Sequence, residues 1–217
     1  MFITFEGIEG CGKSTQARRL HARLRELRIP SVLTLEPGGT RLGQELRGIL
    51  LDSRNQHLSP LAELLLYAAD RAQHMEEVIK PALDRKSWVL CDRFFDATTV
   101  YQGYARGQDM TLIRILNEKA SLGIFPDLTF LFDCEVEIGL QRALKRTKAL
   151  FQEGQDRFER EKRDFHETVR AGYLALAKKE PDRFVVVDGT LKKNELEGIL
   201  FQYVEPFVSE KSGLGGT

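Results

Sequence analysis

Short apolar runs alternate with segments of helical periodicity along the whole chain. Three of the runs end on a carboxylate: "SWVLCD" at 87–92, "DLTFLFD" at 127–133 and "RFVVVD" at 183–188. Two more strands are predicted at Phe2–Phe5 and Ser31–Glu36. A strand that is apolar throughout and polar where it emerges is typical of a buried parallel sheet. Strands that alternate with helices therefore predict an α/β fold with crossover helices.

Two segments carry the spacing of buried helix faces. Beyond residue 15, apolar side chains recur at intervals of three and four, at Ala17, Leu20, Leu24 and Leu27. A second helix is predicted to begin at Ser59–Pro60, a capping serine followed by a first-turn proline, and to run at least to Ile79. Because ligands of parallel sheets bind beyond the carboxyl ends of the strands, the polar residues at those ends are the first candidates for function.

The stretch "FEGIEGCGKST", from Phe5 to Thr15, has the Gly-x-x-x-x-Gly-Lys-Ser pattern of a phosphate-binding loop. Its backbone N–H groups and the following helix N-terminus would face anionic oxygens. Lys13 adds a charge, and Ser14 adds a hydroxyl ligand for Mg²⁺. A plain glycine-rich turn is the alternative, but the flanking strand and helix favour a nucleotide site. The residues predicted to hold the nucleotide are Gly7, Ile8, Glu9, Gly10, Cys11, Gly12, Lys13, Ser14 and Thr15.

Composition restricts the class of protein. The 217 residues fit one domain, expected at 1–211, followed by a short tail at 212–217 that is expected to be disordered. The 32 basic and 32 acidic residues cancel, so no global field favours nucleic acid or an anionic membrane. No apolar run is long enough to span a bilayer, and Phe2–Phe5 is too short for a signal peptide. A cytoplasmic protein without nucleic-acid or membrane partners is expected.

Neither cysteine nor histidine shows the spacing of a metal site. The three cysteines have no Cys-x-x-Cys pairing, which suits a reducing compartment. They are Cys11, Cys91 and Cys134. The four histidines are also scattered, and we expect surface or packing positions for them rather than ligand roles. They are His21, His57, His74 and His166. Zinc chemistry is therefore not expected.

Asp92 ends an apolar strand, the position at which phosphate-loop proteins keep a carboxylate directed at Mg²⁺. Asp133 ends another strand and competes for that role. We favour Asp92 because Arg93 follows it and puts a guanidinium where a phosphate would lie. A structural ion pair of Arg93 is the alternative.

The helix predicted from Ser59 carries Tyr67 and Arg71 four residues apart, so both lie on one side of it. Thr98 and Gln102 repeat this spacing after Arg93. An aromatic plane with hydrogen-bond donors and acceptors beside it suits the edge of a nucleobase. Core packing of the tyrosine and solvent exposure of the Thr–Gln pair are the alternatives.

The basic segment around Arg142 and Arg146 leads into a highly charged stretch without a clear apolar stripe. It is either a solvated helix face or a mobile lid, at about 142–157, that brings cations over a transferred phosphoryl group. A phosphate monoester, whose second pKa is about 6, needs arginines rather than a base to accept a phosphoryl group. Arg47, Arg93, Arg142 and Arg146 are expected around the cleft. A hydroxyl acceptor would instead need a base, and Glu36 is the one candidate.

At these residues the sequence resembles the bacterial thymidylate kinases, which transfer the γ-phosphoryl group of ATP to dTMP. The resemblance covers nearly the whole chain and rests on "FEGIEGCGKST", "EPGGT", "LLYAADRAQH", "CDRFFDATTVYQGYARG", "FPDLTFLFD" and "RFEREKRDFHETVRAGY". It implies a phosphate-loop kinase fold, a three-layer α/β/α sandwich with a central, mainly five-stranded parallel sheet and a mobile lid. It also implies Mg²⁺ as cofactor, ATP and dTMP as substrates, and a homodimer joined through helices.

The resemblance assigns roles on the phosphate side of the site. Lys13, Ser14 and the loop glycines match residues that hold the ATP phosphates and Mg²⁺. Glu9 matches a carboxylate near the 3′-hydroxyl of the acceptor sugar. Arg93 and Arg47 match arginines on the dTMP phosphate.

Other matched positions concern the nucleoside of the acceptor. Tyr67 falls where the family has an aromatic ring stacked on thymine. Arg71, Thr98 and Gln102 match groups that hydrogen-bond the base. Tyr101 falls where a tyrosine crowds a ribose 2′-hydroxyl and so favours a deoxy sugar. Glu36 and Pro37, which begin "EPGGT", belong to the same acceptor site.

Three departures from the family bear on catalysis. Leu35 stands where an arginine usually precedes Glu-Pro-Gly-Gly. Gly10 stands where some relatives carry a catalytic arginine in the phosphate loop, so the charge is expected from the lid, with Arg146 first and Arg142 second. The lid has "TKALFQEGQ" where a short Arg-Gly turn is common.

Two other functions use a phosphate loop. One is a kinase for a deoxynucleoside or another monophosphate; with Glu36 as base, thymidine would replace dTMP as the acceptor. The other is a nucleotide-gated switch that binds a partner protein. The chain lacks the Asn-Lys-x-Asp motif that reads guanine, and such a switch would have no use for a lid or for base-facing residues.

Overall fold

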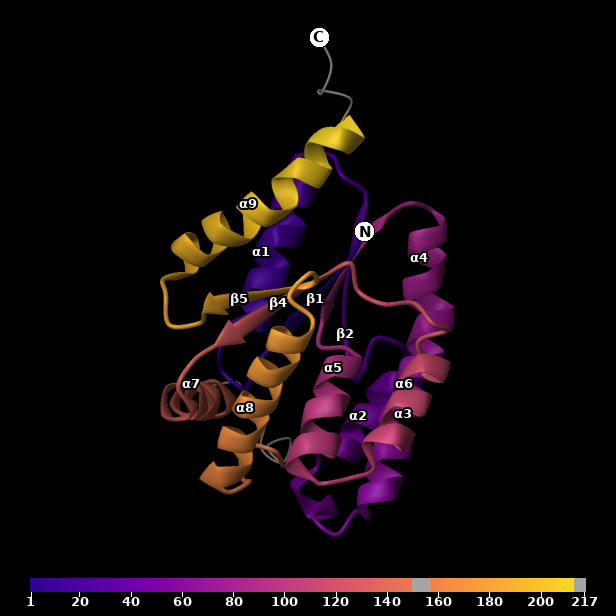
Figure 1. The fold of residues 1–217 in the computed structure, drawn as a ribbon, viewed down its shortest axis with the longest axis vertical. Coiled ribbons are helices and arrows are strands. Elements are labelled where there is room, and N and C mark those ends of the chain that lie inside the picture. Colours follow the sequence, from indigo (N-terminus) through magenta and orange to yellow (C-terminus); the bar gives the residue numbers. More distant parts are fainter. Residues whose placement is uncertain (150–156, 213–217) are drawn as a thin grey trace.

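The computed structural model describes residues 1–149 and 157–212, and it leaves aside the side chains of 146–149 and 209–212. In this part of the chain five strands form one parallel sheet in the order β2-β3-β1-β4-β5 (Figure 1). The strands are β1 Phe2–Glu6, β2 Ser31–Leu35, β3 Trp88–Asp92, β4 Leu128–Asp133 and β5 Phe184–Asp188. The five predicted strands are thus confirmed to within a residue at each end, and so is the parallel arrangement.

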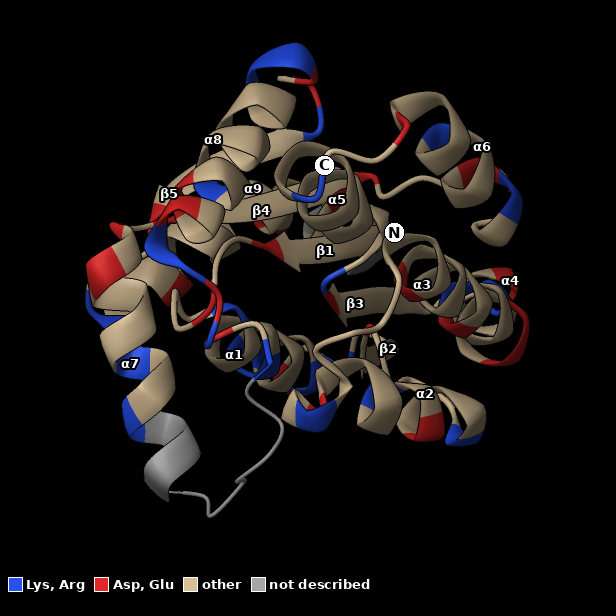
Figure 2. Ribbon diagram, turned by 90° about the horizontal axis from the view of Figure 1, so that it is seen from below, with Lys and Arg blue, Asp and Glu red and all other residues tan. Residues whose placement is uncertain are grey.

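Helices cover both faces of the sheet and produce three layers. On one face α1 (Lys13–Glu26) packs against β1, β2 and β3, and α9 (Lys193–Ser212) packs against α1. On the other face lie α5 (Phe95–Thr98) and α8 (Arg163–Lys179), which Figure 2 shows across the sheet from α1. The same figure shows acidic and basic residues interspersed over these elements. The remaining α-helices are α2 Arg41–Leu51, α3 Pro60–His74, α4 Lys80–Asp84, α6 Met110–Ala120 and α7 Val136–Ala149.

The helix predicted from Ser59 begins as expected, because the Ser59 hydroxyl accepts a hydrogen bond from the Ala62 N–H and Pro60 occupies the first turn. It passes from α3 through a π-helical turn, Met75–Ile79, into α4. A second π-helical segment, Thr99–Ala105, follows α5 directly. A short 3₁₀ turn, Ser53–Asn55, separates α2 from α3. Neither π-helical segment is visible in the sequence pattern.

The sheet is buried and aligns the carboxyl ends of its strands. Every residue of β1 is buried, and the rings of Phe5, Phe130 and Phe132 pack together in the core. Phe5 pairs with Asp92 in β3, and Asp92 pairs with Leu35 in β2. The residues that follow β1, β2 and β3 therefore emerge side by side, where the candidate site lies.

The predicted disordered tail at 212–217 and the centre of the predicted lid lie outside the described residues, apart from Ser212, which ends α9. The two edges of the predicted lid are described: residues 142–149, which end α7, and Arg157. The lid and the tail remain predictions.

Candidate active site

The phosphate loop joins the central strand β1 to α1 through three glycines in the left-handed region. Gly7, Gly10 and Gly12 have φ angles of 136°, 74° and 108°. At Gly10 there is also no space, because an added Cβ would overlap the carbonyl oxygen of Gly139 in α7. A Cβ at Gly139 would in turn lie 2.6 Å from the Glu9 carbonyl oxygen. The loop and α7 therefore touch backbone to backbone, and no side chain fits between them.

Lys13 lies beneath this loop. Its ammonium donates hydrogen bonds to the carbonyl oxygens of Gly7, at 2.9 Å, and Ile8, at 2.6 Å. It also lies 3.4 Å from Cys11 Sγ. These contacts keep a positive charge at the centre of the loop, next to the N-terminus of α1, where anions are favoured.

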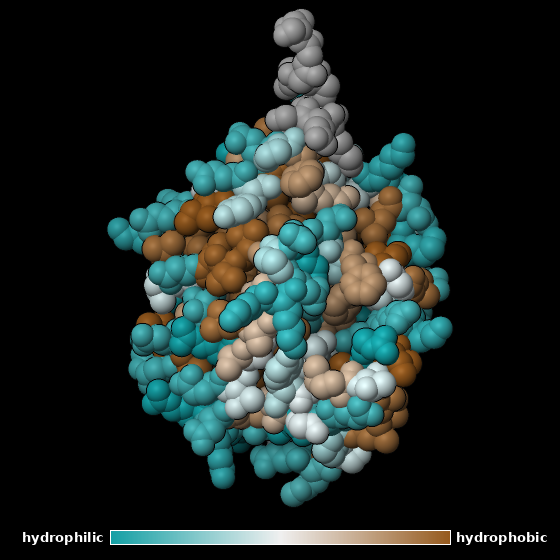
Figure 3. All heavy atoms as spheres, viewed as in Figure 1, coloured by the Kyte–Doolittle hydropathy of each residue, from teal (hydrophilic) through white to brown (hydrophobic). Residues whose placement is uncertain are grey.

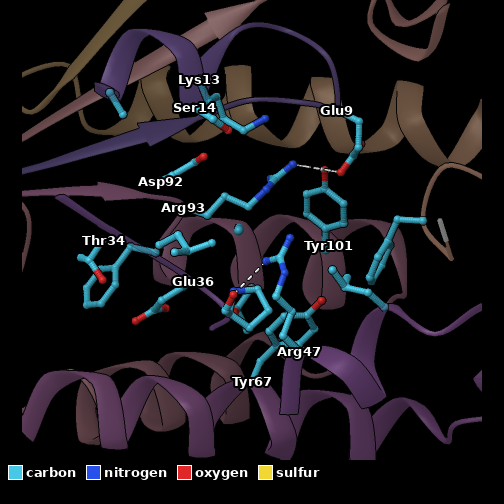
Figure 4. Close-up of a pocket in the computed structure, with 18 of the residues that line it drawn as sticks. Glu9, Lys13, Ser14, Thr34, Glu36, Arg47, Tyr67, Asp92, Arg93 and Tyr101 are labelled. Atoms are coloured by element: carbon cyan, nitrogen blue, oxygen red, sulfur yellow. Dashed lines mark hydrogen bonds and ion pairs between the residues drawn. The ribbon is translucent and has the colours of Figure 1, made fainter. Parts of the chain in front are cut away.

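The structure distinguishes between the two candidate metal carboxylates. Asp92 lines the same cavity as Ser14, and Figure 4 shows its carboxylate and the Ser14 hydroxyl on facing sides. Asp133 instead accepts two hydrogen bonds from Arg170, at 2.6 and 2.9 Å, and does not line that cavity. This arrangement agrees with the preference for Asp92.

Arg93 is the most connected charge of the site. It follows β3 in the left-handed region, with φ 71°, which is uncommon for an arginine and typical of strained functional positions. Its guanidinium donates to Glu9 Oε1 at 2.9 Å and to the Tyr101 hydroxyl at 3.1 Å (Figure 4). It also donates to the Tyr173 hydroxyl at 3.0 Å. Arg93 thus forms the ion pair, with Glu9, that was the alternative to a phosphate-binding role. The same side chain also lines the cavity, so the two roles are compatible.

Glu9 is held ionised in this cluster. Burial favours its neutral form, but Arg93, with the nearby His166 ring and Lys13, outweighs burial and holds the pKa of Glu9 well below its usual range. The Tyr101 hydroxyl donates to Glu9 Oε1 at 2.6 Å. His166 Nδ1 lies 3.5 Å from Glu9 Oε2, and His166 is fully buried. His166 thus occupies a buried packing position, one of the two expected for it, and its ring also faces the carboxylate that contacts Arg93.

The predicted base-reading residues come together on one wall. Tyr67 and Arg71 from α3 line the cavity together with Thr98 and Gln102 from α5 and the π-helical segment. Arg71 is 1% exposed and donates to the Thr98 hydroxyl at 2.8 Å. Solvent exposure, the alternative for Thr98 and Gln102, is excluded because both are buried.

Glu36 is engaged within the protein. One carboxylate oxygen accepts from Arg71 Nε and the other contacts His74 Nδ1, both at 3.0 Å. His74 Nε2 in turn lies 2.6 Å from the Thr34 hydroxyl. A carboxylate with both oxygens in buried contacts is a poor general base, so the geometry speaks against the deoxynucleoside alternative. Glu36 instead fixes Arg71 against the wall.

The loop after β2 positions Arg47. The Glu36–Pro37 peptide bond is cis, and the Pro37 carbonyl oxygen accepts from Arg47 Nη1 at 2.8 Å (Figure 4). The next residue, Gly38, donates its N–H to Asp70 Oδ1 at 3.0 Å. Leu35 is 38% exposed at the cavity edge. Arg47 and Arg93 are thus held on opposite sides of one space.

The two lid arginines stand differently. Arg142 on α7 donates to the Gly189 carbonyl oxygen at 2.7 Å and does not line the cavity. The side chain of Arg146, one turn further along α7, lies outside the described residues. Their catalytic roles remain predictions.

One cavity of about 520 Å³ collects these groups. Every residue predicted to bind the acceptor lines it, together with Gly10, Lys13, Ser14 and Asp92. Sequence reasoning missed Phe158, which also lines it, and His166 and Tyr173, which hold its charged residues. His166 and Tyr173 share a helix face with Val169. Polar side chains on an otherwise apolar, buried helix face were the sequence signal that could have marked them as functional.

An anion-binding backbone therefore adjoins a pocket with a flat aromatic wall and two arginines, a combination that defines a phosphate-loop kinase acting on a nucleotide. The family model described as thymidylate kinase matches residues 5–198. The chain belongs to the thymidylate kinase family.

Individual relatives agree with this assignment. A thymidylate kinase from Geobacter sp. (strain M21) is 57% identical over 189 residues, which cover 87% of this chain and 84% of that protein. One from Desulfosudis oleivorans is 52% identical over 206 residues, covering 94% and 96%. The crystal structure of thymidylate kinase from Ehrlichia chaffeensis superposes with a TM-score of 0.70 at 38% identity, covering 86% of this chain and 91% of that one.

Proposed function

We propose that this protein transfers the γ-phosphoryl group of ATP to dTMP and so produces ADP and dTDP for dTTP synthesis. The proposal rests chiefly on the single cavity that joins the phosphate loop to the arginine and aromatic wall. The transfer is a direct in-line displacement without a covalent enzyme intermediate. Such a reaction depends on positioning and on cations around the moving group rather than on covalent chemistry.

The donor half suits ATP with Mg²⁺. The ion prefers oxygen ligands and is usually shared between one or two carboxylates and substrate phosphates. Ser14 and Asp92 offer a hydroxyl and a carboxylate on facing sides of the cavity. Among residues 1–149 and 157–212 no three His, Cys, Asp or Glu side chains could hold a metal together. Ser14 and Asp92 would therefore hold the ion jointly with phosphate oxygens, and its charge would offset that of the phosphates.

The acceptor half suits a phosphate monoester. Arg93 and Arg47 face the cavity as cations, whereas Glu36 is held between Arg71 and His74. The phosphate of dTMP is already a nucleophilic anion near neutral pH and needs no base. Arg93 holds this phosphate, and Glu9 and Tyr101 face the deoxyribose.

The remaining positive charge comes from the lid. Gly10 cannot carry an arginine, because any side chain there would overlap the Gly139 backbone. Arg146 on α7 is the first candidate for the cation over the transferred group, and Arg142 is the second. Lid closure would bring this charge in and exclude water.

A substrate panel tests the function. ADP production with Mg²⁺ and ATP is measured with dTMP, dUMP, ribose TMP, thymidine and dGMP. Strong and selective activity with dTMP is expected. Activity with thymidine but not dTMP would make Glu36 the base and overturn the assignment of the arginines. Activity with none of them would leave only nucleotide binding and favour the switch.

We also propose a homodimer joined through α2 and α3, which pack against each other. Leu42 and Ile49 on α2 and Leu61 and Leu65 on α3 are each more than 40% exposed. Light scattering of Leu65→Glu should show a monomer where the natural chain is a dimer. The matched control is Phe207→Glu at the exposed apolar area along α9 (Figure 3), which should leave the dimer intact. Dissociation by the control alone would move the interface to α9.

We propose a cytoplasmic location. Cys11, Cys91 and Cys134 are all free and buried, as suits a reducing compartment. Within the described residues no helix is both long and apolar enough to cross a membrane. Fractionation of cells that express the natural chain would test the location, and recovery with the membrane fraction would contradict it.

A further inference from the structure

Glu63 on α3 is a buried carboxylate that the transfer reaction does not use. It is 1% exposed and does not line the cavity. One of its oxygens, Oε2, forms an ion pair with Arg157, the last residue of the predicted lid. The other oxygen, Oε1, accepts a hydrogen bond from Gln102 Nε2 at 2.8 Å and lies 3.7 Å from Arg106 Nε. Glu63 therefore sits behind the base wall and forms a hydrogen bond with Gln102, one of the wall residues.

This contact decides which end of the Gln102 amide faces the cavity. Glu63 forms an ion pair with Arg157 through Oε2 and accepts the hydrogen bond of Gln102 Nε2 through Oε1, and a carboxylate oxygen paired in this way accepts rather than donates. The oxygen and nitrogen of an amide are often interchangeable by shape alone, but here the chemistry leaves one choice. The NH₂ end must face Glu63. The carbonyl oxygen, Oε1, is the end left for a ligand.

The neighbouring group on the wall has the opposite polarity. Arg71 donates through Nε to Glu36, through Nη1 to Asn117 and through Nη2 to Thr98. A guanidinium has five N–H donors and no acceptor, so whatever faces the ligand from Arg71 is a donor. The wall therefore presents a donor at Arg71 and an acceptor at Gln102. A 2,4-dioxopyrimidine offers the complement, an acceptor at O4 and a donor at N3–H, whereas a 4-aminopyrimidine offers the reverse.

We propose that Glu63 is a positioning residue for substrate specificity: it holds the Gln102 amide with its carbonyl toward the base and so selects thymine over cytosine. This inference rests on the proposed function, because it concerns the acceptor of that reaction. The competing explanation is that Glu63 serves only to anchor Arg157 behind the wall.

The test compares two acceptors on one enzyme preparation. kcat/KM is measured for dTMP and for dCMP, and their ratio is independent of the fraction of enzyme that is folded. Glu63→Gln keeps the shape of the side chain, but the new amide at position 63 can either donate or accept a hydrogen bond. The Gln102 amide can therefore rotate and present its NH₂ end to the base. The dTMP-to-dCMP ratio should fall by about tenfold or more, through a gain for dCMP as well as a loss for dTMP.

Arg157→Lys is the matched control. It disturbs the ion pair with Glu63 but leaves the carboxylate facing Gln102. Its ratio should equal that of the natural chain even if its thermal stability falls. An equal fall of the ratio in both variants would assign the effect to the ion pair and overturn the proposal.

Gln102→Leu closes a double-mutant cycle. This variant alone should lower the ratio, and adding Glu63→Gln to it should change the ratio no further. If Glu63→Gln does not fold, the single Gln102→Leu variant can still refute the proposal. An unchanged dTMP-to-dCMP ratio in Gln102→Leu would do so. An unchanged ratio in folded Glu63→Gln would leave Glu63 a purely structural role. Absence of dTMP activity in the natural chain would instead refute the proposed function. The experiment therefore distinguishes failure of the proposed function from failure of the proposal on Glu63.

Discussion

Apart from Asp92, the donor half of the cavity is one continuous stretch of chain, whereas the acceptor half is a set of side chains brought together from separate elements. Residues 7–15 supply the donor half, and their shape depends on three left-handed glycines and on contact with the backbone of α7. On the acceptor side, Arg71 comes from α3, Arg93 from the end of β3 and Gln102 from the π-helical segment.

The two halves also keep their charges in different ways. In the donor half Lys13 contacts only backbone carbonyls and a thiol among the hydrogen bonds described, so its charge is available to an anion. In the acceptor half Arg71 is bound to Glu36, and Arg93 to Glu9. These carboxylates orient the guanidinium groups but also reduce the net positive charge. The donor half is therefore suited to holding phosphates, and the acceptor half to recognising a particular molecule.

Arg146→Ala should have the largest effect, because it removes the one cation that neither half supplies. Turnover should fall by about 10³-fold or more while KM for dTMP changes little, since the charge matters mainly in the transition state. Steady-state kinetics with saturating ATP measures both quantities. Unchanged turnover would remove Arg146 from the mechanism and make Arg142 the next variant to measure.

Gly10→Ala tests whether the donor half depends on backbone contact. A methyl group there would overlap Gly139 and require a left-handed alanine, so the loop must move. kcat/KM for ATP should fall by about 10²-fold, with dTMP binding in the absence of ATP unaffected. Gly48→Ala on α2, where an added Cβ meets nothing within 4 Å, is the control and should keep full activity. Equal activity of both variants would mean that the loop tolerates displacement.

The same contrast explains what could be predicted from the sequence. The donor half could be predicted, because its residues are contiguous and follow the spacing that a phosphate-binding loop requires. The five strands could as well, because buried parallel strands are apolar runs with polar ends. On the acceptor side, helical spacing grouped Tyr67 with Arg71 and Thr98 with Gln102, and all four line one cavity.

The partners of these residues could not be predicted. Glu63, His74 and His166 each sit on a buried helix face that local spacing describes as packing, and only the tertiary fold brings them to Gln102, Glu36 and Glu9. The Gly10–Gly139 contact is similar, since its two halves are far apart in sequence. Long-range polar pairs leave no periodic pattern, which is why the sequence indicated the site but not what holds it.

Asp70→Asn tests how the acceptor loop is held, through the dependence of stability on pH. Burial, with the nearby Glu36 charge, raises the pKa of Asp70 to about 6 in the folded protein, from an ordinary 3.8. Between these values the unfolded chain has lost the proton and the folded chain keeps it, so stability falls as pH rises through that window. Above it the loss is on the order of 2–3 kcal/mol.

The amide variant keeps an oxygen for the Gly38 N–H and has no such titration. It should melt at a temperature several degrees above the natural chain at pH 8 and near it at pH 4. Thermal melts across this range measure the difference, and Asp182→Asn, an exposed carboxylate, is the control. A variant less stable than the natural chain at pH 8 would show that the ionised carboxylate supports the loop.

Leu35→Arg should have the smallest effect. It restores the arginine usual before Glu-Pro-Gly-Gly, at a position 38% exposed on the cavity edge. An exposed charge contributes little, about 1 kcal/mol or less, so KM for dTMP should fall by no more than about fivefold with kcat unchanged. Raising the salt concentration should remove most of this gain, because exposed charges are screened. A tenfold or greater gain would mean that Arg47 and Arg93 do not saturate the acceptor phosphate and that the acceptor half lacks a cation. A negligible change would mean that Arg47 and Arg93 already suffice for the acceptor phosphate.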